Sequence, residues 1–254
     1  MSTEEVNPVK LKSFFSDRKG HDRQESLNLL SSSAAKKGVL EFTMLWGASD
    51  KRHSTKADKD CLLYLFSFLK QVSEVYNLAC ELTIIFADTH AYLNGYAPLD
   101  FNRYWDEIRY SVKKHNFSWM ISSFLVKDRV NELDFKTISG YLDNIVLNSD
   151  SLFESIADRI PNPEIINTFE HYAKRHCNRI GSHPRGIFFK NSLSAAKAYI
   201  YFTLTEADII AEQLPKSIFL TYTSKDEEFI LPTLPAIRLY SIKSWLITIL
   251  WFSN

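Results

Sequence analysis

The sequence is poor in cysteine and carries no excess of charge of either sign. Its three cysteines, Cys61, Cys80 and Cys177, lie far apart and form no Cys-x-x-Cys pair. We therefore expect reduced, mostly buried thiols, as in a cytoplasmic protein. Lysine plus arginine and aspartate plus glutamate each number 30, so the formal net charge is zero. This balance argues against a nucleic-acid-binding protein that depends on overall positive charge, and it leaves a local basic patch open.

The sequence also lacks a long apolar segment. Residues Met1 to Lys12 are polar and contain no apolar core of a secretory signal. The one membrane-like run, Trp245–Phe252, is far shorter than the roughly 20 residues that a membrane-spanning helix needs. We expect a cytoplasmic protein that makes no use of a membrane, and the sequence leaves its oligomeric state open.

What is present is enough apolar material for one substantial core. Apolar residues make up 45% and aromatic residues 14% of the 254 residues, which excludes a globally disordered chain. Residues 1–37 are polar and predict an N-terminal extension with a short helix around Gln24–Leu30. Residues 38–254 contain no repeat and no low-complexity linker, and they predict a single Rossmann-like catalytic domain.

Strand-like and helix-like periodicities alternate along this domain. Strands are predicted at Val39–Leu45, from Leu82 to about Phe86, at Phe117–Val126 and at Ser217–Thr223. Helices are predicted at Lys56–Val75, Asp100–His115, Asp134–Arg159, Pro163–Arg179 and Ser192–Gln213. Two further strands, 228–231 and 236–241, follow the polar turn at 224–227. The predicted fold is α/β, a Rossmann-like three-layer domain with a mostly parallel sheet and antiparallel C-terminal strands.

Asp88, Thr89 and His90 end the apolar run that begins at Leu82. Open α/β sheets bind their ligands beyond the carboxyl ends of their strands, so this turn is our candidate catalytic site. An imidazole titrates near neutral pH, which suits His90 to acid–base chemistry, and Asp88 is suited to orienting it or to binding an ammonium group. The alternative is that Asp88 only caps the following segment.

A polar loop with Ser49, Lys51 and Arg52 follows the first predicted strand. A strand–helix–strand unit places this loop beside the end of the second strand, so these residues are expected to face Asp88 and His90. The loop contains neither the dinucleotide nor the Walker glycine pattern. We therefore expect no cofactor, and we expect Lys51 and Arg52 to bind a phosphate or carboxylate. A solvated basic loop is the alternative.

No metal site is expected from the histidines. His171 and His176 are five residues apart, so they do not share a helix face as a zinc-binding pair would. Tyr199 and Tyr201 also lie on different faces of their predicted helix, so one is expected in the core and the other in a more open position.

The order of these segments resembles the isonitrile synthase family, the pyoverdine/dityrosine biosynthesis proteins. The matching pieces are Val39–Leu45, Ala48–Lys51, Ile84–Asp88, Tyr104, Leu214–Thr223 and Phe229–Pro235. The similarity extends from residue 38 to about residue 245 and lies more in segment order than in short motifs.

This resemblance implies an enzyme that converts the α-amine of an aromatic amino acid to an isonitrile, with the carbon taken from a pentulose phosphate. Its substrates would be an amino acid and a sugar phosphate. The substrate-binding candidates are Lys51, Arg52, Tyr104, Tyr201, Glu206 and Lys225, and the catalytic candidates are His90, Asp88 and Ser49.

Several positions depart from the family pattern. The family's strand Arg, Ser and His correspond to Phe219, Thr221 and Thr223, and the Gly after Asp88 is Thr89. A chain with these replacements uses another substrate, uses Lys225 or Arg238 in place of the missing groups, or has lost the activity and kept the fold as a binding protein.

A second resemblance is to the tRNA-dependent cyclodipeptide synthases. Gly47-Ala-Ser49 is similar to that family's Gly-x-Ser loop, and Phe202 stands where its Tyr-x-x-x-Glu pair would place a Tyr before Glu206. Ser49 would then accept an aminoacyl group, and aminoacyl-tRNA would be the partner.

Overall fold

The computed structural model describes residues 11, 14–15, 21–36, 38–47, 53–93, 98–121, 135–160, 166–167, 170, 192–221 and 236–239. Its strands are β1 (Val39–Trp46), β2 (Ala79–Phe86), β3 (Ser118–Ile121), β4 (Ile218–Thr221) and β5 (Ala236–Arg238). Its helices are α1 (His21–Ala34), α2 (Lys56–Tyr76), α3 (Asp88–Leu93), α4 (Pro98–Lys114), α6 (Phe135–Leu147), α7 (Ser149–Glu154), the 3-10 helix η3 (Ala157–Arg159) and α9 (Ser192–Gln213).

The described strands form one sheet in the order β3-β2-β1-β4-β5, and every pair in it is parallel. The predicted Rossmann-like α/β class is confirmed. The pairing of β1 with β2 runs from Val39 opposite Ala79 to Trp46 opposite Phe86. The strand order reverses between β1 and β4, which is where sheets of this type form their ligand crevice.

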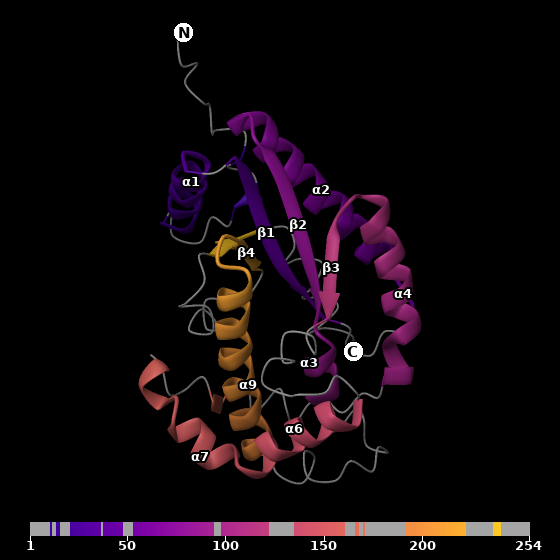
Figure 1. The fold of residues 1–254 in the computed structure, drawn as a ribbon, viewed down its shortest axis with the longest axis vertical. Helices are drawn as coiled ribbons and strands as arrows, with labels where there is room; N and C mark the ends of the chain where they lie inside the picture. The colour runs from indigo at the N-terminus through magenta and orange to yellow at the C-terminus, as the bar shows by residue number, and fades with distance from the viewer. Residues whose placement is uncertain are drawn as a thin grey trace.

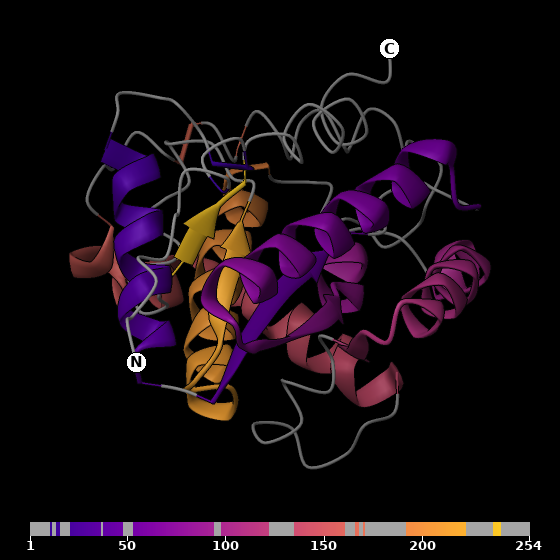
Figure 2. The same ribbon diagram turned by 90° about the horizontal axis from the view of Figure 1, so that it is seen from above.

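Alternate residues of the central strands face two different helical layers. Phe42, Ile84 and Ile218 belong to a core formed with α1, α2 and α4. Their strand neighbours Ile85 and Phe219 belong to a separate core formed with the C-terminal half of α9. The sheet is therefore covered on both faces, as a parallel sheet requires. Figure 2 shows α1 and α4, which both belong to the first of these cores, at opposite ends of the molecule.

Helix α9 is longer than the strand beside it and extends past the carboxyl ends of the strands. Its N-terminal half packs against α6 and α7 through residues such as Ala198, Phe202 and Ile200. Figure 1 shows α3, α6 and the lower end of α9 together below the strands. Buried residues lie on most sides of α9, which is the pattern of a helix enclosed by other elements.

The prediction of antiparallel C-terminal strands is wrong for the two strands that the structure describes. β4 lies parallel to β1, and β5 lies parallel to β4. The connection from residue 222 to residue 235 is long enough for the crossover that parallel neighbours need. The third predicted strand of this region, 228–231, lies outside the described residues.

Two other boundaries differ from the predictions. The described part of the expected N-terminal extension joins the core, because Leu11, Phe14 and Phe15 are buried and α1 contributes buried leucines. The single helix predicted for 134–159 is divided into α6, α7 and η3. The first division falls at Asn148, whose side-chain amide donates to the carbonyl oxygen of Asn144 at 2.9 Å. No helix within the described ranges is long and apolar enough to cross a bilayer.

A chain of buried hydrogen bonds joins β1, α4 and α2. Trp46 Nε1 donates to Tyr104 Oη at 2.8 Å, and Tyr104 Oη donates to Asp58 Oδ1 at 3.0 Å. Asp58 also completes the capping box of α2 with Thr55. Burial and the neighbouring Asp58 carboxylate raise the pKa of Tyr104 well above 10.0, so its hydroxyl keeps its proton.

We expect Tyr104→Phe to destabilise the protein, because it removes the acceptor of the buried Trp46 N–H and one of the donors to the Asp58 carboxylate. The free energy of unfolding in urea should fall by about 1–3 kcal/mol. The control is Tyr110→Phe in the same helix, whose side chain is 73% exposed; it should change stability by less than about 0.5 kcal/mol. Equal effects of the two substitutions would show that the hydrogen-bond chain does not stabilise the fold.

Candidate functional site

Asp88 and His90 lie in α3, the short helix that starts directly after β2. The Asp88 carboxylate accepts a hydrogen bond from the backbone N–H of Thr89, the next residue of the same helix, at 2.9 Å. Its side chain is partly exposed, whereas Thr89 and His90 are buried. The turn of the helix carries His90 away from solvent and toward α9.

His90 is paired with Glu206 of α9. The two side chains are joined through His90 Nε2 and Glu206 Oε2, and their exposed fractions are 11% and 1%. A buried carboxylate is costly unless a partner compensates it, so this pair fixes the position of α3 against α9. Glu206 was expected to bind substrate; in the structure it holds the candidate catalytic histidine.

Two aromatic side chains of α9 enclose the His90 ring. The ring of Tyr199 lies 5.2 Å from it and the ring of Phe202 lies 5.1 Å from it, both edge to face. Tyr199, Phe202 and Glu206 are spaced by three and four residues, so one helix face presents all of them. Among the described residues, none hydrogen-bonds the second ring nitrogen of His90, Nδ1. The arrangement therefore holds a histidine by a carboxylate at one nitrogen and leaves the other for proton exchange.

The ends of β1 and β2 lie side by side at this site. The backbone N–H of Ala87 donates to the carbonyl oxygen of Trp46 at 3.0 Å, so the segments that follow the two strands start next to each other. Ser49, Lys51 and Arg52 lie outside the described residues, and so does Lys225. Their expected roles as nucleophile and anion-binding groups stay predictions.

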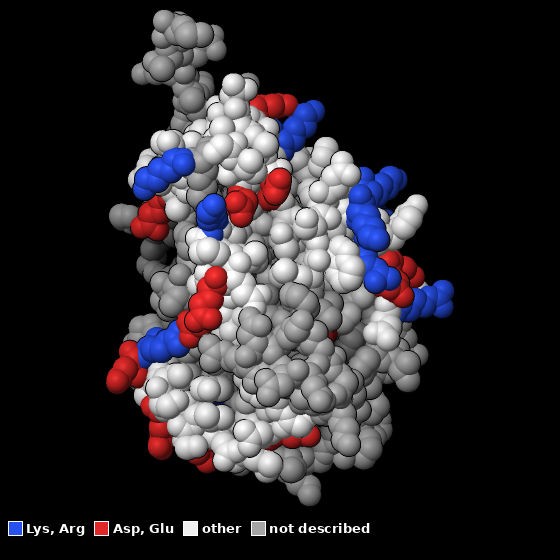
Figure 3. Space-filling model, viewed as in Figure 1, with Lys and Arg blue, Asp and Glu red and all other residues white. Residues whose placement is uncertain are grey.

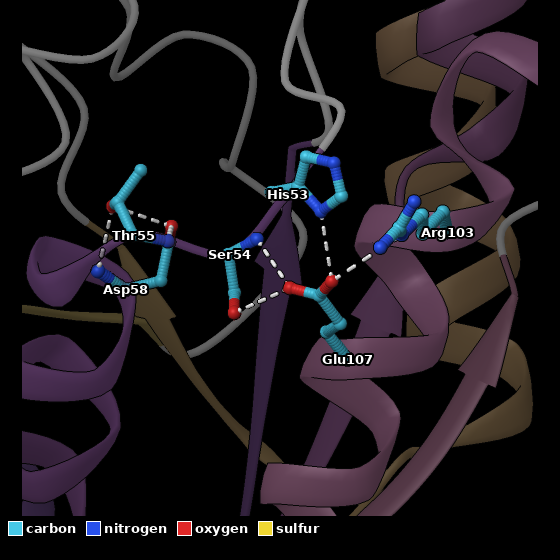
Figure 4. A network of polar contacts seen from close by, with 6 residues as sticks. All are labelled: His53, Ser54, Thr55, Asp58, Arg103 and Glu107. Atoms are coloured by element: carbon cyan, nitrogen blue, oxygen red, sulfur yellow. Dashed lines mark hydrogen bonds and ion pairs between the residues drawn. The ribbon is translucent and has the colours of Figure 1, made fainter.

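A polar network, referred to here as the Glu107 clamp, fixes the chain directly after this loop (Figure 4). Glu107 of α4 accepts hydrogen bonds at 2.8 Å from both the backbone N–H and the Oγ of Ser54. His53 Nδ1 lies 2.9 Å from the other carboxylate oxygen, and Arg103 Nε lies 3.8 Å from it. The loop between β1 and α2 is thereby held at its exit.

The clamp changes the acidity of its carboxylate. The hydrogen bond with His53, followed by the two from Ser54, lowers the pKa of Glu107 from 4.5 to about 2. Glu107 therefore stays ionised in the folded protein under conditions in which an ordinary glutamate takes up a proton.

Two further substrate-binding candidates lie away from His90. Tyr104 is fully buried, and its hydroxyl joins Trp46 and Asp58 within the core. Tyr201 packs against the apolar clusters of α6 and α7. Tyr199 and Tyr201 are both half-buried, unlike the expected division into one core and one open residue, and it is Tyr199 that contacts His90.

Sequence reasoning missed Tyr199 and Phe202 as neighbours of His90, and it missed the Glu107 clamp. The signal for the first two is their spacing from Glu206, which places all three side chains on one face of the helix. The clamp has no local signal, because Glu107 and Ser54 belong to different elements. Within the described ranges, no three His, Cys, Asp or Glu side chains gather closely enough to hold a metal ion.

No family model matches the sequence, and a search of curated proteins finds no match. Among solved structures, the chain is similar to the PvcA protein from Pseudomonas aeruginosa. The TM-score is 0.62 at 11% identity, over 91% of this chain and 82% of that one. PvcA is a member of the isonitrile synthase family, and the likeness supports a distant relationship in fold. A tyrosyl-tRNA synthetase complexed with L-tyrosine, from Archaeoglobus fulgidus, covers 94% of this chain and 64% of that one at 15% identity, with a TM-score of 0.45.

We expect the stabilising effect of the Glu107 clamp to disappear in acid. A carboxylate with a lowered folded-state pKa stabilises the protein above pH 4.5, and this stabilisation is lost as the pH falls toward 2. Glu107→Gln should therefore unfold at a lower urea concentration than the unsubstituted protein at neutral pH, and the difference should shrink as the pH is lowered to about 3.

The control for this measurement is Glu74→Gln. Glu74 is exposed, and its ion pair with Lys70, at 3.9 Å, lies within the same helix. This substitution should change the unfolding midpoint little at any pH. A Glu107→Gln effect that stays constant from neutral pH to acid would contradict the clamp's role.

Proposed function

We propose that this chain is a biosynthetic enzyme that modifies the α-amine of an amino acid, with His90 as its acid–base group. The observation that carries the proposal is the pairing of His90 with Glu206 beyond the carboxyl end of β2. This is the part of a Rossmann-like sheet at which ligands bind. The PvcA-like fold supports the comparison with the isonitrile synthases.

In the proposed reaction, the role of His90 is to transfer protons at the substrate nitrogen. An amino acid carries an ammonium group at neutral pH, and the nitrogen becomes nucleophilic only after it loses a proton. In the proposed mechanism His90 takes this proton at Nδ1, and Glu206 stabilises the imidazolium that forms. A carboxylate behind a histidine performs this same orienting and stabilising role in hydrolytic triads.

The remaining substrate is proposed to be a pentulose phosphate, which supplies the carbon. Lys51 and Arg52 are the proposed phosphate-binding groups, because their loop follows β1, and β1 ends beside the end of β2. The Glu107 clamp supports this role, since it holds the residues that directly follow Arg52. Asp88, partly exposed at the start of α3, is the proposed contact for the ammonium group.

The amino acid is proposed to be aromatic, in keeping with the family resemblance. Phe219 stands in place of the family's strand Arg, and it is buried between the sheet and α9. This position therefore gives no polar contact to a substrate. The substrate carboxylate must be bound elsewhere, and Lys225 and Arg238 are the proposed substitutes.

The test is conversion of tyrosine or tryptophan, with ribulose 5-phosphate, to a product whose mass matches the isonitrile. His90→Gln should lower the rate by roughly 100-fold or more, because it removes the acid–base group. Glutamine is chosen because its amide still donates to Glu206, whereas an alanine would leave that carboxylate buried and uncompensated.

The control is His115→Gln. His115 lies at the end of α4, where it contacts Phe66 and Phe117. It should leave the rate unchanged, and thermal unfolding should show that both variants fold. Full activity in a folded His90→Gln variant would remove His90 from the mechanism. Absence of product from the unsubstituted protein with either amino acid would leave the binding-protein interpretation of the fold.

A second candidate function is aminoacyl transfer from tRNA, as in the cyclodipeptide synthases. The observation that favours it is that Phe202 and Glu206, the pair that stands for that family's Tyr-x-x-x-Glu, both contact His90. In this alternative Ser49 is the nucleophile that carries the aminoacyl group.

The variant Ser49→Ala distinguishes the two proposed functions. If Ser49 is an acyl acceptor, incubation with aminoacyl-tRNA should give a covalent adduct, visible as a mass increase of the intact protein, that Ser49→Ala abolishes. Ser67→Ala is the control, because Ser67 is exposed on α2 and donates to the carbonyl oxygen of Leu63 in the same helix. No adduct on the unsubstituted protein, or equal adducts in all three proteins, would exclude the aminoacyl-transfer function.

A further inference from the structure

A cavity lies on the other side of the sheet from His90. It has a volume of about 220 Å³ and is lined by Phe86, Asn102, Trp105, Asp106, Arg109 and Trp119, and it is called the aromatic pocket below. Phe86 belongs to the core shared with α2 and α4, whereas its strand neighbour Ile85 faces α9. The aromatic pocket is therefore separate from the His90–Glu206 pair.

Three aromatic rings form the apolar part of this pocket. The Phe86 ring lies 5.7 Å from the Trp105 ring and 6.0 Å from the Trp119 ring, and both pairs are tilted. Trp105 and Trp119 are each half-buried. Rings packed in this way present apolar faces and edges to the cavity, which has room for one flat ring system.

The polar side of the pocket is formed by residues of α4. The Arg109 guanidinium lies over the Trp119 ring, 5.2 Å from its centroid, and its Nη2 donates to Asp106 Oδ1 at 2.7 Å. Asp106 uses a single nitrogen of the guanidinium, which has five N–H donors. The stacked and paired Arg109 is held in place with donors left for a ligand.

The two charged side chains that line the pocket, Asp106 and Arg109, pair with each other, and the guanidinium donors that Asp106 does not use favour an anionic ligand over a cationic one. Arg109 already covers the face of Trp119 that a cation would seek. Figure 3 shows basic and acidic side chains beside one another over α4, at the right edge of the view. A carboxylate near Arg109 gains charge-assisted hydrogen bonds, and an ammonium group there would be repelled.

We propose that the aromatic pocket binds a flat aromatic molecule that carries a carboxylate. The ring lies against Phe86, Trp105 and Trp119, and the carboxylate accepts hydrogen bonds from Arg109. This site does not depend on the acid–base role of His90, and it gives the protein a second small-molecule site on the opposite face of the sheet.

Binding of three probes with related rings tests the charge preference: indole-3-acetate, neutral indole and cationic tryptamine. By titration calorimetry, indole-3-acetate should bind most tightly and tryptamine most weakly. Arg109→Gln should weaken indole-3-acetate binding about tenfold, as expected for the loss of a charge-assisted hydrogen bond, and should change indole binding by less than about twofold. The matched control Lys114→Gln removes the same charge from the same helix outside the pocket, and it should have an effect of less than about twofold.

The location is tested by the indole N–H signals of the protein in NMR spectra. The signals of Trp105 and Trp119, assigned through the variants Trp105→Phe and Trp119→Phe, should shift on addition of indole-3-acetate. The variant His90→Gln should bind this probe as the unsubstituted protein does, which separates this site from the proposed active site. The proposal is overturned if tryptamine binds best, if Arg109→Gln leaves indole-3-acetate binding unchanged, or if neither tryptophan signal shifts.

Discussion

The parallel sheet must be covered by helices on both faces, and the rest of the structure follows from this constraint. Each central strand sends alternate side chains to different layers, so Phe42 and Ile84 meet α2 while Ile85 and Phe219 meet α9. Without α9, one whole face of apolar side chains would be exposed to water, at a cost of about 25 cal/mol for each Å² of apolar surface. The single helix α9 therefore covers the apolar side chains on that face of the sheet.

The same helix also provides half of the candidate active site. Because α9 runs past the carboxyl ends of the strands, its middle brings Glu206 to His90 at the point where β2 ends. A buried carboxylate and a buried imidazole each cost free energy alone, and each is compensated by the other. The pair thus joins the stability of the fold to the placement of the candidate acid–base group.

The opposite face shows a different use of polar groups. There the Trp46–Tyr104–Asp58 hydrogen bonds and the Glu107 clamp tie β1, α2 and α4 together. These contacts hold the start of α2, which follows the loop of Ser49, Lys51 and Arg52. The loop that is expected to bind a phosphate is therefore anchored to α4 at its C-terminal end, through Ser54. The aromatic pocket lies on this face too, between α4 and β3, so the two proposed binding sites share the sheet and use different layers.

Local pattern was sufficient for most of the fold. The alternation of Val39–Leu45, the helical spacing after Lys56 and the apolar run from Leu82 predicted a strand–helix–strand unit, because strands repeat every two residues and helices about every 3.6. The position of His90 at a strand end followed from the same reasoning. The parallel direction of β4 and β5 could not be read locally, since a strand has the same alternation in either direction and only its partners decide. The break of the predicted 134–159 helix at Asn148 was likewise invisible to periodicity.

What the sequence by itself determined is the alternation of strands and helices and the candidate histidine after β2. Tertiary structure alone decided which side chains meet it. Glu206 is separated from His90 by more than a hundred residues, and no spacing rule connects two elements whose contact depends on how a helix crosses a sheet. For the same reason, the sequence offered Tyr104 as a substrate-binding candidate, and the structure makes its hydroxyl a buried hydrogen-bond partner of Trp46 and Asp58. Periodicity fixes which face of an element is apolar, and only the packing of that face against others fixes the partners of its polar groups.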